Sequence, residues 1–181
     1  MKIAQLMVTG FEDVEAFTTI DLLRRAQIEV DTISLSNERS LKSARMIEIK
    51  CDKLFKDVEL VDYDGFILAG GPGTNNYYKY EDLQDELIKA HNEHKLIAAI
   101  CAAPSYLASI GLLKKLKATA FPKVINILAD NEVIVVSERV VVDKNIITAQ
   151  ALGSAIPFAL AIIEYLLDQE RAEKIKAEIC Y

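Results

Sequence analysis

The chain alternates short apolar runs with longer stretches in which apolar residues recur every three or four positions. The short runs predict strands buried on both faces, as in a parallel sheet, and the periodic stretches predict amphipathic helices. The predicted strands span residues 2–8, 28–35, 65–69, 96–100 and 146–149. The predicted helices span residues 11–27, 81–94, 104–110 and 156–167, with a further helical piece reaching residue 180. Because strands and helices alternate almost throughout, the pattern predicts an α/β fold with a mostly parallel sheet.

Other segments carry a less regular pattern. Residues 36–45 are polar and predict a loop, whereas residues 46–51 alternate and predict a half-exposed edge strand that ends at Cys51. The basic stretch 112–116 predicts a short helical segment. The remaining expectations are a short strand and loop at 119–122, and a hairpin or pair of edge strands at 133–137 and 139–143. No repeat or linker interrupts the chain, so residues 1–181 predict a single domain.

The segment Lys95–Tyr106 carries the clearest chemical signal. The predicted strand 96–100 ends at Cys101, and Pro104 suits the first turn of a helix. Small residues flank the cysteine, as in a nucleophile elbow, although alanines stand where the usual elbow has glycines. A thiol placed there lies at a helix N-terminus, where backbone N–H groups and the helix dipole favour the thiolate. The alternative is a buried structural cysteine that ends a core strand.

Charge and composition narrow the range of partners. The chain has 21 Lys and Arg against 27 Asp and Glu, a formal net charge of −6, and no long basic block. This balance argues against nucleic acid or an anionic membrane as the main partner. No apolar run approaches the roughly 18 residues of a membrane span, and the first residues do not resemble a signal peptide. We therefore expect a cytoplasmic protein.

The cysteine and histidine content argues against a metal site. The three cysteines are widely spaced and form no CxxC pattern, which predicts free thiols rather than a disulfide framework or a zinc site. The chain has only two histidines, His91 and His94. Neither a structural metal nor a metal cofactor is expected.

Two further features follow predicted strands at the edge of the sheet where Cys101 lies. Ligands of open parallel sheets bind at this carboxyl edge. The segment Gly10–Glu15 follows the first strand, and Gly70–Gly73 reads Gly-Gly-Pro-Gly after the strand 65–69. Each is commonplace alone, since carboxylates suit a first helical turn and glycine runs usually form plain turns. Together with Cys101, however, they predict a site in which backbone N–H groups form an oxyanion hole.

This combination resembles the DJ-1/ThiJ/PfpI superfamily, and its DJ-1-like branch in particular. The matching segments are Gly10–Glu15 with residues 21–26 behind it, Leu68–Gly71, Ile97–Pro104 and Phe158–Glu164. The resemblance implies a flavodoxin-like three-layer sandwich with helices on both faces of the sheet. It also implies a homodimer and a reactive elbow cysteine that works without a cofactor.

The resemblance implies roles for individual residues. A protonated glutamate, here Glu15, hydrogen-bonds the thiolate of Cys101, and Arg45 matches an arginine near the dimer interface. The anion-binding backbone amides map to Gly70, Gly71 and Ala102. A protonated glutamate is chemically consistent with this site, because a carboxyl group beside a thiolate has a raised pKa and can then donate a hydrogen bond.

One position departs from the pattern of the superfamily. Many members carry a histidine near the cysteine in a Thr-His-Pro-like stretch, where this chain reads Thr119-Ala-Phe-Pro122 and places Phe121. His91 and His94 precede the strand 96–100 and are expected at its far end from Cys101. A Cys–His dyad for peptide hydrolysis is therefore not expected.

Two functions stay open at this point. The first is a cofactor-free stress-response enzyme that acts on small reactive carbonyls such as methylglyoxal, by glyoxalase III-type hydration or by deglycase-type repair of early glycation adducts. In it the Cys101 thiolate attacks the carbonyl and Glu15 shuttles a proton. The second is a non-enzymatic oxidative-stress sensor or chaperone, switched when an oxidant converts Cys101 to a sulfinate.

Overall fold

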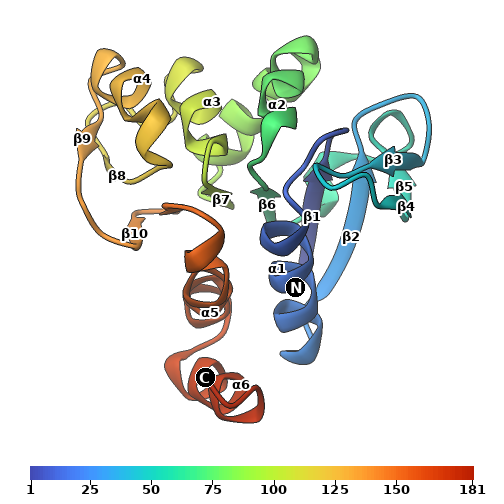
Figure 1. The fold of residues 1–181 in the computed structure, drawn as a ribbon, viewed down its shortest axis with the longest axis vertical. Helices are drawn as coiled ribbons and strands as arrows, with labels where there is room; N and C mark the ends of the chain where they lie inside the picture. Colours follow the sequence, from blue (N-terminus) through green and yellow to red (C-terminus); the bar gives the residue numbers. More distant parts are fainter.

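The computed structural model describes residues 1–181 and contains a seven-stranded central sheet (Figure 1). The strand order is β10-β11-β7-β6-β1-β2-β5, and every neighbouring pair is parallel except β10 and β11. The strands are β1 (Lys2–Met7), β2 (Glu29–Ser34), β5 (Lys53–Leu54), β6 (Gly65–Leu68), β7 (Leu96–Ile100), β10 (Val140–Asp143) and β11 (Ile146–Ala149). The predicted α/β class with a mostly parallel sheet is confirmed.

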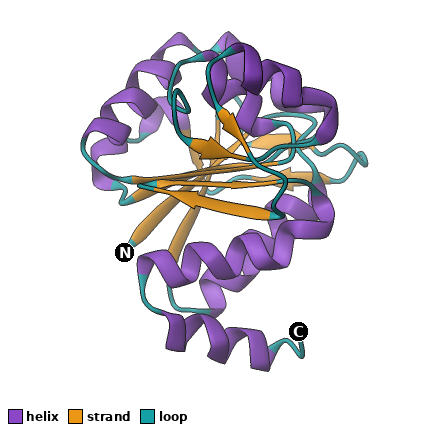
Figure 2. Cartoon of the chain, turned by 90° about the vertical axis from the view of Figure 1, so that its left-hand side faces the viewer, coloured by secondary structure: helices purple, strands orange, loops and turns teal.

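Helices cover both faces of the sheet, which is seen nearly edge-on in Figure 2. One face carries α1 (Asp13–Arg25), α5 (Ala155–Leu166) and α6 (Gln169–Glu178), and the other carries α2 (Glu81–Asn92), α3 (Ala103–Ser109) and α4 (Ile125–Asp130). Buried strand residues alternate between the two layers: in β7, Ile97 and Ala99 pack toward α2–α4, whereas Ala98 and Ile100 pack toward α1 and α5. A strand buried on both faces must be apolar at every position, which explains the run Leu-Ile-Ala-Ala-Ile.

The segment 36–51 differs from its predicted structure. Within the predicted loop, β3 (Ser40–Lys42) pairs antiparallel with β4 (Glu48–Lys50) in a separate two-stranded sheet. The half-exposed strand expected at 46–51 is present as β4, but it pairs only with β3, and the edge strand of the main sheet is β5. Cys51 is fully buried rather than half-exposed, because it packs with Met7 and Phe11 where the hairpin returns to the sheet.

The segment 112–143 also differs. Residues 112–116 form turns instead of a helical stretch, and the strand expected at 119–122 lies earlier, as β8 (Lys117–Ala118). β8 pairs in parallel with β9 (Ile134–Val135), and β10 pairs with β11, so the hairpin spans 140–149 instead of 133–143. The helix α4 was not predicted, because six residues are too few to show helical periodicity. The 3-10 helices are η1 (Phe55–Asp57), η2 (Leu60–Asp62), η3 (Pro72–Lys79), η4 (Pro122–Val124) and η5 (Leu152–Ser154).

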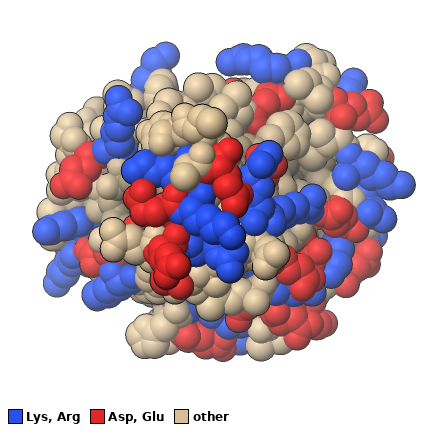
Figure 3. Space-filling view, turned by 90° about the horizontal axis from the view of Figure 1, so that it is seen from below, with Lys and Arg blue, Asp and Glu red and all other residues tan.

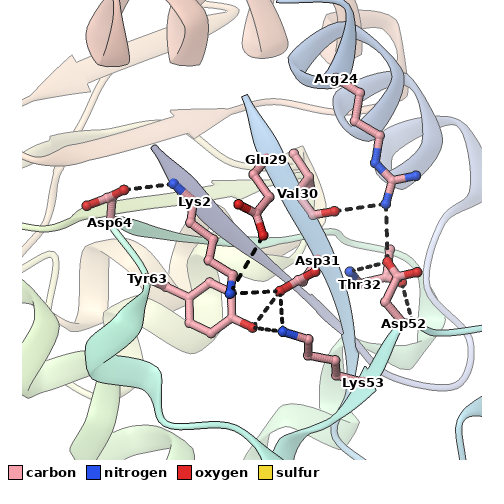
Figure 4. A network of polar contacts seen from close by, with 10 residues as sticks. All are labelled: Lys2, Arg24, Glu29, Val30, Asp31, Thr32, Asp52, Lys53, Tyr63 and Asp64. Carbon is pink, nitrogen blue, oxygen red and sulfur yellow. Dashed lines mark hydrogen bonds and ion pairs between the residues drawn. The ribbon is translucent and has the colours of Figure 1, made fainter. Parts of the chain in front are cut away.

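A polar network ties together the strands β1, β2 and β5 (Figure 4). The carboxylate of Asp31 in β2 accepts a hydrogen bond from the Tyr63 hydroxyl at 2.8 Å and lies 2.8 Å from Lys53 Nζ and 3.5 Å from Lys2 Nζ. Lys2 is the first residue of β1, and its backbone N–H donates to Asp64, the residue before β6. The network therefore fixes the amino end of the sheet, opposite the edge where Cys101 lies.

The surface shown in Figure 3, viewed from the end where α6 lies, carries acidic and basic side chains interspersed with one another. No single sign of charge dominates that face. Among the helices of the chain, none combines the length and the apolar character that a bilayer crossing needs.

Candidate functional site

Cys101 occupies the turn between β7 and α3. Its φ is +66°, in the left-handed region that residues other than glycine seldom adopt. Backbone hydrogen bonds hold this conformation: the Cys101 N–H donates to Ala149 O at 2.9 Å, and the Cys101 carbonyl accepts from Phe121 N–H at 2.7 Å. A strained strand-to-helix turn that is fixed on both sides is the geometry of a nucleophile elbow.

Four strand ends come together around the thiol. Glu15 lies in the first turn of the helix after β1, Gly71 follows β6, Cys101 follows β7 and Leu152 follows β11. These strands are neighbours in the sheet, and the chain reverses its direction of winding between β1 and β6, where open α/β sheets bind ligands. They line a cleft of 590 Å³. The cleft is lined by Glu12, Glu15, Arg45, Gly71, Pro72, Cys101, Ala102, Phe121, Lys123, Val124, Ala151 and Leu152.

Glu15 is a buried carboxyl group with one free oxygen. Glu15 as a whole residue is 1% exposed, and its Oε2 accepts a hydrogen bond from Gly70 N–H at 2.9 Å. Burial raises the pKa of Glu15 to about 7, and the charge of Glu12 adds to the rise, whereas the contacts with Cys101 and Gly70 oppose it. The other oxygen, Oε1, is buried and accepts or donates no hydrogen bond. A pKa of about 7 means that a substantial fraction of the molecules carries this proton near neutral pH.

The pKa of the Cys101 thiol depends on the protonation state of Glu15. Burial raises the pKa of Cys101 to about 12, and the adjacent Glu15 carboxylate contributes to the rise. The backbone N–H groups of Gly71 and Ala102 lower it, as expected at a helix N-terminus, but they do not outweigh burial. The prediction that the helix terminus favours the thiolate thus accounts for only part of the environment. Because a protonated Glu15 no longer repels a thiolate, the two groups ionise as a pair.

The resemblance implies that the backbone amide of Gly70 binds an anion, but the structure gives this amide a different role. Its N–H donates to Glu15, so it does not face an anion at the sulfur. A methyl group added at Gly70 would lie 2.5 Å from Cys101 Cβ and 2.8 Å from Glu15 Oε2. Gly70 therefore acts as the spacer that lets Cys101 and Glu15 pack side by side, and Gly71 and Ala102 are the amides directed at the sulfur.

Arg45 and Phe121 both line the cleft. The Arg45 guanidinium lies 3.8 Å from the carboxylate of Glu12, not against Glu15, and its side chain is 72% exposed. Phe121 is partly buried in the wall of the cleft beside the elbow, where the superfamily pattern places a histidine. His91 and His94 do not line the cleft.

Several cleft residues were missed in the sequence. Ala151 and Leu152 follow β11, and the rule that the carboxyl ends of parallel strands share an edge identifies them once that strand is considered. Pro72 belongs to the glycine-rich turn that was recognised. Lys123 and Val124 belong to η4, which follows no strand of the main sheet, so no local pattern places them at the site.

The remaining thiols lie away from the cleft. Cys51 is buried, which raises its pKa to about 11, and Cys180 is exposed in the last turn of the chain. No group of three or more His, Cys, Asp or Glu side chains is arranged to hold a metal ion. Of the three cysteines, Cys101 alone lines the cleft.

The chain is an α/β sandwich with a mostly parallel sheet, and its elbow cysteine lies beside a buried carboxyl group. These features place it in the class of α/β proteins that carry a cysteine at a nucleophile elbow. The DJ-1/PfpI family matches residues 1–165, and the chain belongs to this family. This confirms the resemblance found in the motifs.

Individual relatives agree with this membership. The chain is 33% identical to protein dj-1beta of Drosophila melanogaster, over 94% of this chain and 91% of the relative. It is 37% identical to protein DJ-1 homolog B of Arabidopsis thaliana over 90% of this chain, which spans 37% of the length of that relative. Among solved structures, oxidized DJ-1 of Toxoplasma gondii superposes with a TM-score of 0.94 at 37% identity, covering 99% of this chain and 98% of the other. The flavodoxin-like fold implied by the resemblance is therefore confirmed.

The raised pKa of Glu15 makes the stability of the fold depend on pH. The folded state keeps this proton up to about pH 7, whereas the unfolded chain releases it near 4.5, so the folded state binds more protons between these values. The free energy of unfolding should therefore fall by roughly 3 kcal/mol as the pH rises through this window, and level off above it. Denaturant unfolding of the wild type and of Glu15→Gln at a series of pH values measures this, since the difference between the curves isolates Glu15. A difference that does not change between pH 4.5 and 8 would contradict the raised pKa.

Proposed function

We propose that the chain is a cofactor-free cysteine enzyme that converts small α-oxoaldehydes such as methylglyoxal to 2-hydroxy acids. The observation that carries the proposal is the buried Glu15, with its free Oε1, beside Cys101 in an open cleft. The reaction needs a nucleophile, an acid–base group that is neutral near pH 7 and donors for an oxyanion. The site offers one of each, and membership of the DJ-1/PfpI family supports the assignment.

In the first step the Cys101 sulfur attacks the aldehyde carbon. A sulfur–carbon bond forms, the electron pair of the carbonyl π bond moves to oxygen, and the proton on Glu15 passes to that oxygen. The product is a hemithioacetal. The N–H groups of Gly71 and Ala102, which lower the pKa of the Cys101 thiol, are suited to stabilise the oxyanion as it develops.

In the second step Glu15, now a carboxylate, removes the proton from the former aldehyde carbon. In the resulting enediolate the hydroxyl proton moves from the first oxygen to the second, and the neighbouring carbon takes back the proton held by Glu15. This converts the hemithioacetal to a thioester of the 2-hydroxy acid. Water then attacks the thioester carbonyl, the sulfur–carbon bond breaks and the thiol is restored. The sum is the addition of one water to the oxoaldehyde, with no change in the redox state of the protein.

The site offers a single acid–base group for all these transfers. Phe121 occupies the wall of the cleft without an ionisable group, and neither histidine reaches it. Glu15 must therefore change protonation state several times in each turnover. We expect a turnover number below the roughly 10 s⁻¹ that is typical of enzymes.

The experiment that tests the proposal is the formation of lactate from methylglyoxal by the purified chain, alongside two cysteine variants. Cys180→Ser should keep full activity, since Cys180 is exposed and outside the cleft. Cys101→Ser should reduce lactate formation to the background rate, because the weakly nucleophilic hydroxyl cannot form the thioester at a useful rate. Equal loss in both variants, or in neither, would overturn the assignment.

A second candidate function is redox sensing through Cys101, and the N–H groups around the sulfur favour it. In this reaction the thiolate attacks peroxide to give a sulfenate and water, and a second peroxide oxidises the sulfenate to a sulfinate. The amides of Gly71 and Ala102 and a protonated Glu15 are suited to hydrogen-bond the sulfinate oxygens. The structural relative from Toxoplasma gondii is described as oxidized, which supports this chemistry in the family.

Sensing predicts that mild peroxide produces a stable sulfinate at Cys101 while Cys51 and Cys180 stay reduced. Cys51 is protected by complete burial, and Cys180 lies outside the cleft that holds Glu15 and the amides of Gly71 and Ala102. Peptide mass spectrometry after a peroxide titration measures the modification at each cysteine. Oxidation of all three at similar rates would count against a sensor.

We propose in addition that the chain forms a homodimer. Exposed apolar side chains support this: Val14 and Phe17 on α1 are exposed, and so are Met46 and Ile47. The turn before Met46 hydrogen-bonds Phe11 and Asp13 at the start of α1. Sedimentation velocity of the purified chain measures its mass directly, and a monomer at micromolar concentration would contradict the proposal.

A further inference from the structure

One wall of the cleft is apolar. Phe121, Val124, Leu152 and Pro72 contribute apolar side chains to it, and Leu152 is 46% exposed. Isolated exposed apolar side chains are ordinary, but several that line one concave site indicate a preference for an apolar ligand.

Two of these residues, Phe121 and Leu152, have backbone N–H groups next to Cys101 and Glu15. The Phe121 N–H donates to the carbonyl of Cys101 at 2.7 Å, which fixes the start of the Phe121 side chain next to the elbow. The backbone N–H of Leu152 lies by the carboxyl group of Glu15. A substrate held between Cys101 and Glu15 therefore projects its second substituent into the space bordered by Phe121 and Leu152.

The volume of the cleft also favours a substrate larger than methylglyoxal. Methylglyoxal has five non-hydrogen atoms and occupies little more than a few water molecules, each of about 30 Å³ in the liquid. The cleft measures 590 Å³, within the range of about 300–1,000 Å³ that encloses much larger ligands. A methyl substituent leaves most of the apolar wall in contact with water, whereas a planar ring covers it and stacks against Phe121.

We propose that Phe121 and Leu152 make the cleft selective for α-oxoaldehydes whose ketone carries an apolar, ring-sized substituent, with arylglyoxals preferred over methylglyoxal. The inference rests on the proposed function and names the substrate class of the same site. The reaction is unchanged in its bonds and electrons: phenylglyoxal and one water give mandelate. Phe121, which lacks an ionisable group, contributes to selectivity by contact with the substituent.

The first measurement compares kcat/KM for phenylglyoxal, followed as mandelate, with kcat/KM for methylglyoxal, followed as lactate. The variants are Phe121→His, Leu152→Ala and the matched control Leu167→Ala, which truncates a leucine of similar exposure outside the cleft. We expect each cleft variant to lower the phenyl-to-methyl ratio about tenfold, because comparing the two aldehydes within one variant cancels any effect of the substitution on the chemical steps that both substrates share. Leu167→Ala should leave both values unchanged. Because phenylglyoxal also modifies arginine, initial rates are taken before any adduct on Arg45 is detected by mass spectrometry.

The second measurement tests the selectivity of the cleft by alkylation of Cys101, which does not require enzymatic turnover. Phenacyl bromide and bromoacetone alkylate a thiol by the same displacement, in which the sulfur–carbon bond forms and bromide leaves. The ratio of their rates at Cys101, each divided by the rate with glutathione, reports how well the cleft accepts the ring. We expect a ratio above one in the wild type that falls about tenfold in Phe121→His.

The two measurements separate the failure of the inference from the failure of the proposed function. Absence of turnover with both aldehydes overturns the proposed function, and the alkylation ratio then decides alone whether the cleft selects a ring. Turnover whose phenyl-to-methyl ratio is the same in the wild type, Phe121→His and Leu152→Ala overturns the inference and leaves the enzyme standing. An alkylation ratio that Phe121→His does not change overturns the inference in either case.

Discussion

Replacing Glu15 by glutamine is expected to abolish oxoaldehyde turnover, with a loss in kcat/KM of at least about 100-fold. Glutamine has nearly the same shape and keeps an oxygen to accept the Gly70 N–H, so the packing around Cys101 is preserved. It cannot give up or take a proton, and the hemithioacetal then has no group to move hydrogen between its two carbons. General acid–base groups contribute about 10²–10⁴-fold to such steps. Steady-state kinetics with methylglyoxal measures the loss.

The stability of the same variant provides the control. Glu15 is held at a pKa of about 7 by burial, so an uncharged glutamine should leave the protein at least as stable as the wild type at pH 7. Lost activity in a protein of unchanged or higher unfolding free energy then reflects chemistry and not misfolding. Full activity in Glu15→Gln would rule out the proton shuttle.

Replacing Gly70 by alanine is expected to remove activity and weaken the fold together. The added methyl group would lie 2.5 Å from Cys101 Cβ, 2.8 Å from Glu15 Oε2 and 3.0 Å from Ala102 N, and none of these is the end of a flexible side chain in open space. The elbow, the carboxyl group and the amide donor must all shift. Overpacking of this kind costs about 1–3 kcal/mol, and a displacement of about 1 Å at reacting groups lowers rates roughly 100-fold. Denaturant unfolding and methylglyoxal kinetics measure the two effects.

Gly153→Ala is the matched control for this substitution. Gly153 lies close to the cleft in sequence but does not line it, and a methyl group added there meets no atom within 4 Å. The same glycine-to-alanine change should therefore leave stability and turnover close to those of the wild type. If Gly70→Ala behaves like Gly153→Ala, the close packing of Cys101 and Glu15 is not needed for function.

The arrangement of the central sheet was predictable because its strands are buried on both faces. A run such as Leu-Ile-Ala-Ala-Ile cannot lie at a surface, and the small residues after it leave room for a sharp turn at Cys101. Glu15 and Gly71 were placed at the same edge by topology alone, since both follow parallel strands. The resemblance to a known family added the pairing of Glu15 with Cys101, which sequence separation does not determine.

The features that escaped prediction depend on contacts distant in sequence. Cys51 looked half-exposed in an alternating segment, but the hairpin of β3 and β4 returns it to Met7 and Phe11. The N–H of Gly70 was assigned to an anion, because only the folded structure shows Glu15 as its acceptor. Lys123 and Val124 reach the cleft from η4, which follows β8, and a strand of two residues such as β8 has no sequence pattern of its own.

The measurement that tests the central claim most directly is the rate of lactate formation from methylglyoxal by the wild type and by Cys101→Ser at pH 7. The account predicts saturable turnover by the wild type, and a rate in Cys101→Ser that cannot be distinguished from the uncatalysed reaction. Lactate formation that survives in Cys101→Ser would contradict a cysteine enzyme. Absence of lactate with the wild type would contradict the enzymatic function and leave oxidation of Cys101 as the chemistry of the site.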